Sequence, residues 1–114
     1  MKHDETETGK EDLRGQVVRL TELAGYQKDA VVSRTIVDKS TGTVTLFAFD
    51  AGQGLSEHTS PYDATILVIE GKAGIMIGGR RLKVGAGKLV IMPAGVPHSV
   101  RAVQRFKMLL IMIR

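Results

Sequence analysis

The sequence of 114 residues contains no cysteine and no tryptophan, and its aromatic side chains are two tyrosines and three phenylalanines. The lack of cysteine excludes disulfides, thiolate metal sites and cysteine nucleophiles, and it suits a reducing compartment. Apolar runs are short: the longest, residues 108–113, has the length of a strand, whereas a membrane helix needs about 18 apolar residues. The charged N-terminus lacks the apolar segment of a secretory signal. We therefore expect a soluble, cytoplasmic protein with no membrane partner.

The positive charge is modest and dispersed. Lysine and arginine number 16 against 12 aspartates and glutamates, which gives a net charge of +4. Arg80-Arg81 is the only adjacent basic pair, and the aromatic residues form no recognisable platform for stacking bases. The sequence therefore predicts a mildly basic surface and no nucleic-acid partner.

The chain divides into a short polar segment and one β-rich domain. Residues 1–15 are predicted to be a flexible N-terminal segment. Residues 16–114 are predicted to form a single domain with one core and room for a modest pocket. Residues 21–27 have the composition of one short helical turn, and beyond residue 30 no stretch has helical length and periodicity.

Short apolar stretches separated by turn residues follow at nearly even spacing. Gly78-Gly79, for example, is a two-residue hairpin signal. This pattern predicts an all-β fold, a single jelly-roll sandwich or barrel. The predicted strands cover residues 30–39, 43–49, 54–58, 64–70, 73–77, 80–84, 88–92, 98–103 and 105–113.

Two of these strands, 64–70 and 105–113, are apolar on both faces. A strand of a two-layer β-protein buries one face in its own core, so the second apolar face needs a separate cover. Either the N-terminal segment or a second subunit can provide that cover. Of the two, we expect a second subunit, and hence a homodimer.

Histidines, glycines and a proline recur at spacings that resemble the two motifs of the cupin superfamily, whose members are small jelly-roll barrels. The matching residues are Gly52, His58 and Gly71 for the first motif and Gly87, Pro93, Gly95 and His98 for the second. The resemblance covers residues 40–113 and implies that both histidines face the barrel interior. Gly71 and Gly87 are expected at sharp turns, because glycine reaches positive φ without a Cβ clash.

The resemblance also implies a pocket inside the barrel. Strand alternation places residues 58, 60, 64, 66 and 68 on one face if the intervening turn keeps the phase. The predicted pocket is lined by His58, Ser60, Ala64, Ile66, Met92 and His98. Two neutral imidazoles in a mostly apolar cavity can bind a polar ligand or transfer protons without a metal. Either histidine can alternatively be a hydrogen-bonded core residue.

In metal-binding cupins, two histidines and a glutamate of the first motif and a histidine of the second hold one divalent ion. Carried over by position, the resemblance retains His58 and His98. Ser60 stands at the second histidine position and Ala64 at the glutamate position. Two imidazoles alone are a poor site, because a divalent ion generally requires three or more protein donors. Asp63 is the candidate third ligand, so the cofactor is either none or one ion of iron, manganese, nickel or zinc.

Three functions follow from these residues. The missing ligands and the intact fold signals favour a protein that binds a small molecule in the barrel without catalysing a reaction. A metal-dependent dioxygenase or isomerase that uses His58, His98 and a substitute carboxylate is the alternative. A metal-free enzyme that relies on histidine acid–base chemistry is the third.

Overall fold

The structure, a computed structural model, describes residues 5–7 and 12–114, with side chains from residue 12 onward. The described part of the chain forms nine β-strands and one 3₁₀ turn, which confirms the all-β prediction. In chain order these are β1 (Glu5–Glu7), η1 (Leu20–Glu22), β2 (Val31–Lys39), β3 (Gly42–Phe49), β4 (Gly54–His58), β5 (Ala64–Ile77), β6 (Arg80–Gly85), β7 (Leu89–Met92), β8 (His98–Arg101) and β9 (Phe106–Ile113).

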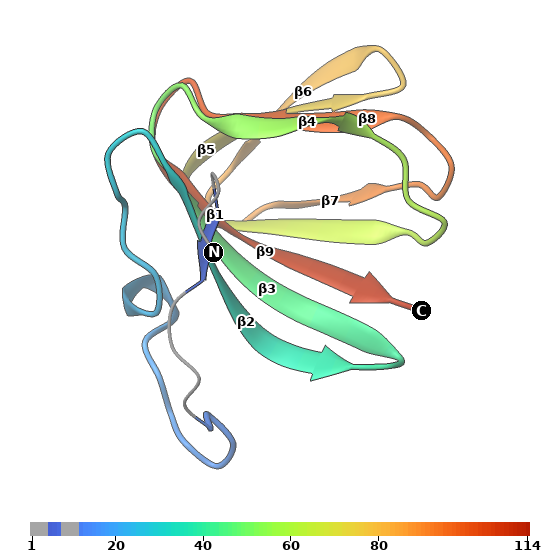
Figure 1. Ribbon diagram of the computed structural model, residues 1–114. Helices are drawn as coiled ribbons and strands as arrows, with labels where there is room; N and C mark the ends of the chain where they lie inside the picture. Colours follow the sequence, from blue (N-terminus) through green and yellow to red (C-terminus); the bar gives the residue numbers. More distant parts are fainter. Residues whose placement is uncertain (1–4, 8–11) are drawn as a thin grey trace.

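The strands curl into two facing layers, which we call the lower and the upper layer after their positions in Figure 1. The lower layer contains β1, β2, β3, β9, the first half of β5 and β7. The upper layer contains β4, β8, the second half of β5 and β6. The strands pair antiparallel, except for β1 and β2, which pair in parallel. The arrangement confirms the predicted jelly-roll type of barrel.

Strand β5 belongs to both layers. The sequence predicted two strands, over 64–70 and 73–77, whereas the structure has one bent strand of 14 residues. Gly71 lies at the bend with a φ of 77° and pairs with Phe106 of β9. A Cβ on Gly71 would lie 2.4 Å from the carbonyl oxygen of Arg105. Glycine therefore lets the strand turn from one layer to the other while β9 stays close.

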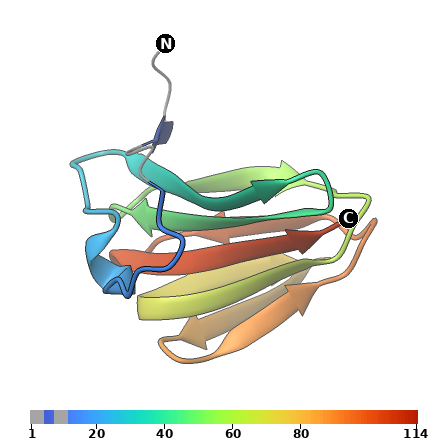
Figure 2. The same ribbon diagram turned by 90° about the horizontal axis from the view of Figure 1, so that it is seen from below.

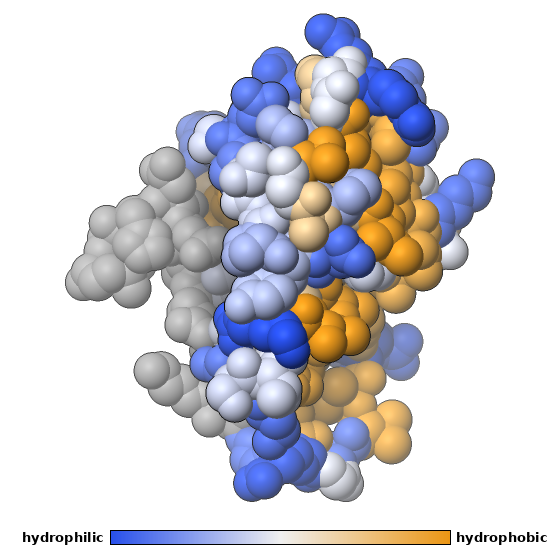
Figure 3. Space-filling view, turned by 90° about the vertical axis from the view of Figure 1, so that its right-hand side faces the viewer, coloured by the Kyte–Doolittle hydropathy of each residue, from blue (hydrophilic) through white to orange (hydrophobic). Residues whose placement is uncertain are grey.

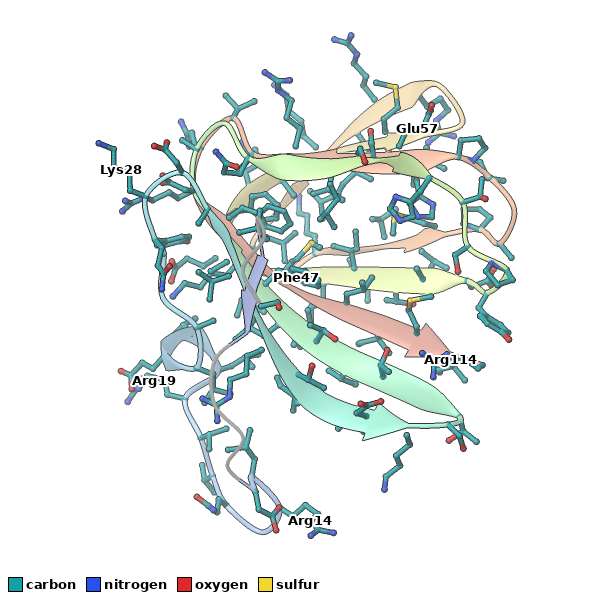
Figure 4. The ribbon with its side chains drawn as sticks, viewed as in Figure 1. Arg14, Arg19, Lys28, Phe47, Glu57 and Arg114 are labelled. Carbon is teal, nitrogen blue, oxygen red and sulfur yellow. The ribbon has the colours of Figure 1, made fainter. Side chains whose placement is uncertain are left out.

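The core lies between the layers, and its two ends differ. Phe49 and Phe106 stack with ring centroids 4.6 Å apart where β3 ends and β9 begins. Phe47, labelled in Figure 4, stacks on Phe49 at 5.8 Å. At the opposite end, where β7 and β9 finish, the core consists of methionine, leucine and smaller side chains. Aromatic packing thus fills one end of the barrel and leaves space at the other.

The stretch of chain before β2, residues 20–26, covers part of the outer surface of the lower layer (Figure 2). Leu20, Leu23 and Ala24 belong to a second apolar cluster outside the barrel core. The strand residues in this cluster are Val32, Ile36, Leu46, Ala48, Ile69 and Leu109. This packing covers part of the outward apolar face of β5 and β9, the face that the sequence left without an assigned cover.

Polar contacts hold residues 20–26 in place. The Tyr26 hydroxyl donates a hydrogen bond to Glu70 Oε2, with 2.6 Å between the oxygens. Lys107 is buried; its Nζ donates to the Thr21 carbonyl at 2.6 Å and lies 4.8 Å from the centroid of the Tyr26 ring. The buried ammonium is therefore paired, as burial of a charge requires.

The remaining outer surface of the lower layer is apolar and exposed. Leu89, Ile91 and Ile113 are 58%, 54% and 74% exposed. Leu67 of β5 pairs with Leu89, and the next cross-strand row on this face contains Ile111, the half-buried Thr65 and Ile91. Figure 3 shows hydrophobic residues, in orange, gathered toward the right-hand side of the view. We call this region, Leu67, Leu89, Ile91, Ile111 and Ile113, the bare apolar surface.

Two predictions concern the start of the chain: a short helical turn over residues 21–27 and a flexible segment over residues 1–15. The 3₁₀ turn at Leu20–Glu22 confirms a short helical turn and places it slightly earlier than the predicted 21–27. The predicted flexible segment over 1–15 lies mostly outside the described residues, so its boundary stays a prediction. In residues 5–7 and 12–114, no helix is long and apolar enough to cross a membrane.

Candidate functional site

A cavity of about 270 Å³ occupies the open end of the barrel. The structure brings all six residues of the predicted pocket into its wall. The lining side chains are Leu55, His58, Thr59, Ser60, Pro61, Ala64, Ile66, Met92, His98, Val100, Met108, Leu110 and Met112. The wall is therefore mainly apolar, and its polar groups are the two histidines and the hydroxyls of Thr59 and Ser60.

A β-bulge brings His58 to this cavity. Leu55 pairs with Val100 and His58 pairs with His98, so Ser56 and Glu57 together oppose a single residue of β8. Leu55 and His58 are three residues apart, and strict alternation would place them on opposite faces. The bulge places both on the inner face. Glu57, by contrast, stands on the outer side of β4 (Figure 4).

His98 begins β8 directly after Pro97 and is 2% exposed. Because β4 and β8 are neighbours, its ring meets that of His58, with centroids 4.5 Å apart and planes inclined by 77°. The Nε2 atoms of the two rings are 3.2 Å apart. Two imidazoles separated by 40 residues of sequence thus share one corner of the cavity.

The hydrogen bonds on the far sides of the rings determine which nitrogens carry protons. His58 Nδ1 lies 2.7 Å from the Ser56 carbonyl oxygen, and His98 Nδ1 lies 3.1 Å from that of Val96. A carbonyl oxygen only accepts, so each Nδ1 carries the proton and donates. In the neutral rings both Nε2 atoms are then bare acceptors that face each other. A shared proton or a donor group on a ligand relieves this contact between lone pairs.

Burial lowers the pKa of the His98 imidazole below its ordinary value, and the neighbouring His58 lowers it further. Both effects disfavour the charged ring. The hydrogen bond to Val96 acts in the opposite direction and is the smallest contribution. His98 is therefore a neutral ring with an acceptor nitrogen near neutral pH.

Two loops, 59–63 and 93–97, lie together at the cavity mouth (Figure 1). The Gly95 N–H donates to the Ser60 carbonyl oxygen at 2.8 Å. The buried Ser60 hydroxyl accepts from the Tyr62 N–H at 3.1 Å. Ser60 thus anchors the mouth and still has its own hydroxyl proton available to a ligand.

The structure places Asp63 outside the cavity wall. Its Oδ1 accepts a hydrogen bond from the Ala94 N–H at 2.8 Å, across the two mouth loops. The turn at Pro61 therefore does not point this carboxylate toward the histidines. Asp63 fixes the mouth loop instead of acting as the predicted third ligand.

The donor set provides part of a metal site. Two ligands at about 2.05 Å from one tetrahedral ion are about 3.3 Å apart, close to the 3.2 Å between the Nε2 atoms. The Nδ1–H bonds to carbonyl oxygens are also typical of metal-bound histidine. However, the described residues contain no group of three or more histidine, aspartate or glutamate side chains that could hold an ion. The residues that the structure describes therefore do not complete a metal site by themselves.

Strand β9 supplies three wall residues that the sequence did not assign to the pocket. Met108, Leu110 and Met112 share one face of β9, and they pair with Val68, Ile66 and Ala64 of β5. The sequence already placed residues 106, 108, 110 and 112 on one face of a strand. What it could not indicate is that β9 and β5 are neighbours, because the paired residues are 35 to 48 positions apart in the chain.

Comparison with known proteins agrees with this architecture. Residues 45–114 match the family described as the cupin domain. A conserved protein of unknown function from Streptococcus pyogenes is 36% identical, with a TM-score of 0.84 over 89% of each chain. A cupin 2 conserved barrel domain protein from Leptotrichia buccalis is 33% identical, with a TM-score of 0.80, over 82% of this chain and 46% of that one.

A curated relative covers less of the chain. An uncharacterised protein from Streptomyces coelicolor is 37% identical over 57 residues, which is 50% of this chain and 54% of the relative. The family match is broader, since residues 45–114 include both histidines and every residue of the cavity wall. The chain belongs to the cupin domain family.

Proposed function

We propose that this cupin binds a compact, mainly apolar small molecule that carries a hydroxyl or amide group. The facing Nε2 atoms of His58 and His98 support the proposal most strongly, because a donor placed against them satisfies two acceptors at once. The Ser60 hydroxyl offers one donor in return. The remaining wall, Ile66, Met92 and their apolar neighbours, suits a hydrocarbon body.

Methionine methyl signals test this proposal directly. Met92, Met108 and Met112 line the cavity, while Met76 does not. Phenol and propionamide serve as probes in NMR titrations of protein labelled at the methionine methyl groups. We expect saturable shifts of the three cavity methyls and little change at Met76.

A cavity-filling substitution provides the control. Ala64→Leu adds a side chain inside the cavity and should abolish the shifts, whereas Ala86→Leu on an exposed turn should retain them. No shift with either probe, or equal binding by the Ala64→Leu variant, would overturn the proposal. Electron density in the barrel of crystals grown from untreated protein would identify a copurified ligand.

A metal-dependent dioxygenase or isomerase is the second candidate. The 3.2 Å spacing of the Nε2 atoms favours it, although the remaining donors would have to be water or the substrate. Metal analysis of protein purified without chelator separates the two candidates. Stoichiometric iron, manganese, nickel or zinc that disappears in a His58→Ala variant would support the metal-dependent enzyme.

We also propose that the protein is a homodimer. The bare apolar surface supports this, because it lies outside the cluster in which residues 20–26 pack on the strands, and contiguous apolar patches mark interaction sites. No charged residue belongs to this surface.

A further inference from the structure

A second, larger concavity of about 690 Å³ lies on the outer face of the upper layer. It is separate from the barrel cavity, because its side-chain rim belongs to residues that point away from the core. The inward residues Leu55, Ile75, Leu82 and Val100 contribute to the barrel core. Alternation therefore turns Arg81, Lys83, Ser99 and Arg101 outward. We call this concavity the outer groove.

The floor of the outer groove is backbone, because glycines replace side chains there. One cross-strand row of the sheet contains Gly54, Arg101, Gly74 and Lys83, in that order from β4 to β6. Gly54 and Gly74 thus flank Arg101 and leave open floor on both sides of it. At Gly54 a Cβ would lie 2.3 Å from the Val100 carbonyl oxygen, so glycine also permits the close contact between β4 and β8.

The rim of the outer groove is strongly basic. Arg81, Lys83 and Arg101 all line it and are all exposed, and Glu57 is its one acidic residue. None of the three cations forms an ion pair with a residue that the structure describes. Figure 4 shows Glu57 on this same outer side of β4.

The cations are close enough to act on one ligand. Arg81 and Lys83 are two residues apart on one strand, about 6.6 Å at strand spacing. Lys83 and Arg101 are two strands apart in one row, about 9.6 Å. Their long side chains can converge over Gly74. Like charges on neighbouring positions of a sheet face repel each other, and an anion in the groove offsets that repulsion.

The groove also has an apolar part. Met76 is half-buried between Arg81 and Ser99 in the adjacent row, and Val103 at the rim is 77% exposed. A flexible thioether beside an exposed valine suits a flat organic group. Three cations against one carboxylate favour a partner with more than one negative charge.

We propose that the outer groove is a binding site for a doubly charged organic anion, of which an aryl phosphate monoester is the simplest form. The phosphate lies over Gly74 between Lys83 and Arg101, with Arg81 at its side. The organic group lies against Met76 and Val103. The site is independent of the barrel cavity, and it does not require the histidines.

Phenyl phosphate is the probe, with inorganic phosphate as a second probe, in NMR titrations at low salt. We expect saturable shifts of the Gly54 and Gly74 amides and of the Met76 methyl, with no shift of the Met92, Met108 and Met112 methyls. Phenyl phosphate should bind more tightly than inorganic phosphate, because only it contacts the apolar part. Its affinity should fall as salt is added.

Charge-removing variants decide the outcome. The Lys83→Gln, Arg101→Gln double variant should bind phenyl phosphate about tenfold more weakly or worse. Arg80→Gln is the matched control, since Arg80 does not line the groove, and its affinity should stay within about twofold of wild type. Equal affinity of the double variant and wild type, or an equal loss in the control, would overturn the proposal. Shifts confined to the barrel methyls would do so as well, and would assign the anion to the other cavity.

Discussion

At the scale of single residues, the histidine pair defines the chemistry of the barrel. Each ring is fixed from behind by a carbonyl oxygen, that of Ser56 or Val96, so its free nitrogen points into the cavity. The pair therefore presents two acceptors at one point without needing a charged group. This differs from a buried structural histidine, whose two nitrogens are both satisfied within the protein.

The titration of His98 links this site to stability. Because its pKa is lowered in the folded state, the unfolded chain, with a pKa of about 6.5, binds more protons as the pH falls below that value. The contribution of His98 to the free energy of unfolding is therefore fully present above about pH 6.5. It decreases as the pH falls from about 6.5 through the lower pKa that His98 has in the folded protein. Urea denaturation at several pH values between about 5 and 8, compared with a His98→Asn variant, measures this. We expect the difference in free energy of unfolding between wild type and variant to shrink toward acid pH. If the two free energies instead changed with pH in parallel, the prediction would be wrong.

The residue scale also shows what the sequence could specify. His58, Ser60, Ala64, Ile66, Met92 and His98 were placed by strand alternation and by the family spacing, and all six line the cavity. Asp63 was not predictable in the same way, because Pro61 interrupts the strand before it. Its orientation depends on Ala94, which is 31 residues away.

At the scale of elements, β5 organises the molecule. Its first half pairs with β7 and β9, and its second half pairs with β6 and β8. The sequence predicted a break near Gly71, and glycine does mark a sharp bend with positive φ. Hydrogen bonding continues through the bend, however, so one strand forms. A turn signal alone does not distinguish a chain reversal from a strand that changes layers.

Two glycines with similar backbone angles test the role of this bend. Gly71 and Gly87 have φ of 77° and 85°, but only at Gly71 would a Cβ meet backbone atoms, the nearest at 2.4 Å. Gly87→Ala should cost about 1–2 kcal/mol from the left-handed conformation alone. Gly71→Ala should cost about 3 kcal/mol or more, since β9 must also move. Chemical denaturation compares them, and equal losses would show that the close contact with β9 does not matter.

The outer groove could not be predicted from the sequence, because it depends on how the strands are aligned with one another. In the sequence, Arg81 belongs to the basic pair Arg80-Arg81 beside the Gly78-Gly79 hairpin signal, and Arg101 is 20 residues further along the chain. Only the register of β6, β5 and β8 places the three cations around Gly74. Long-range register depends on the packing of the whole sheet, which a single sequence does not reveal.

At the scale of the whole molecule, the two outer faces of the barrel differ in character. The upper layer exposes the basic outer groove, whereas the lower layer exposes the bare apolar surface beside residues 20–26. The sequence indicated this second apolar face, because residues 64–70 and 105–113 lack alternation. It left open what covers the face. Residues 20–26 cover part of it, around Leu46 and Leu109, and the bare apolar surface lies outside that cluster.

We predict that two copies of the chain meet through the bare apolar surface. Its members come from three neighbouring strands, β5, β7 and β9, so they form one patch that a two-fold axis can pair with itself. Light scattering after size-exclusion chromatography should give about twice the chain mass of 12.4 kDa. A Leu89→Lys, Ile91→Lys double variant should be monomeric, because two buried ammonium groups per subunit would be unpaired in the interface.

Val103→Lys is the matched control for the double variant. Val103 is also an apolar residue on the surface, 77% exposed, but it lies at the outer groove and not on the bare apolar surface. It should remain dimeric, and both variants should keep the β-sheet circular dichroism of the wild type. Leu89 and Ile91 point outward from an edge strand, so lysine there does not disturb the barrel core. A folded double variant that stays dimeric would assign the interface to another surface, and a monomeric wild type would leave the bare apolar surface without a second copy to cover it.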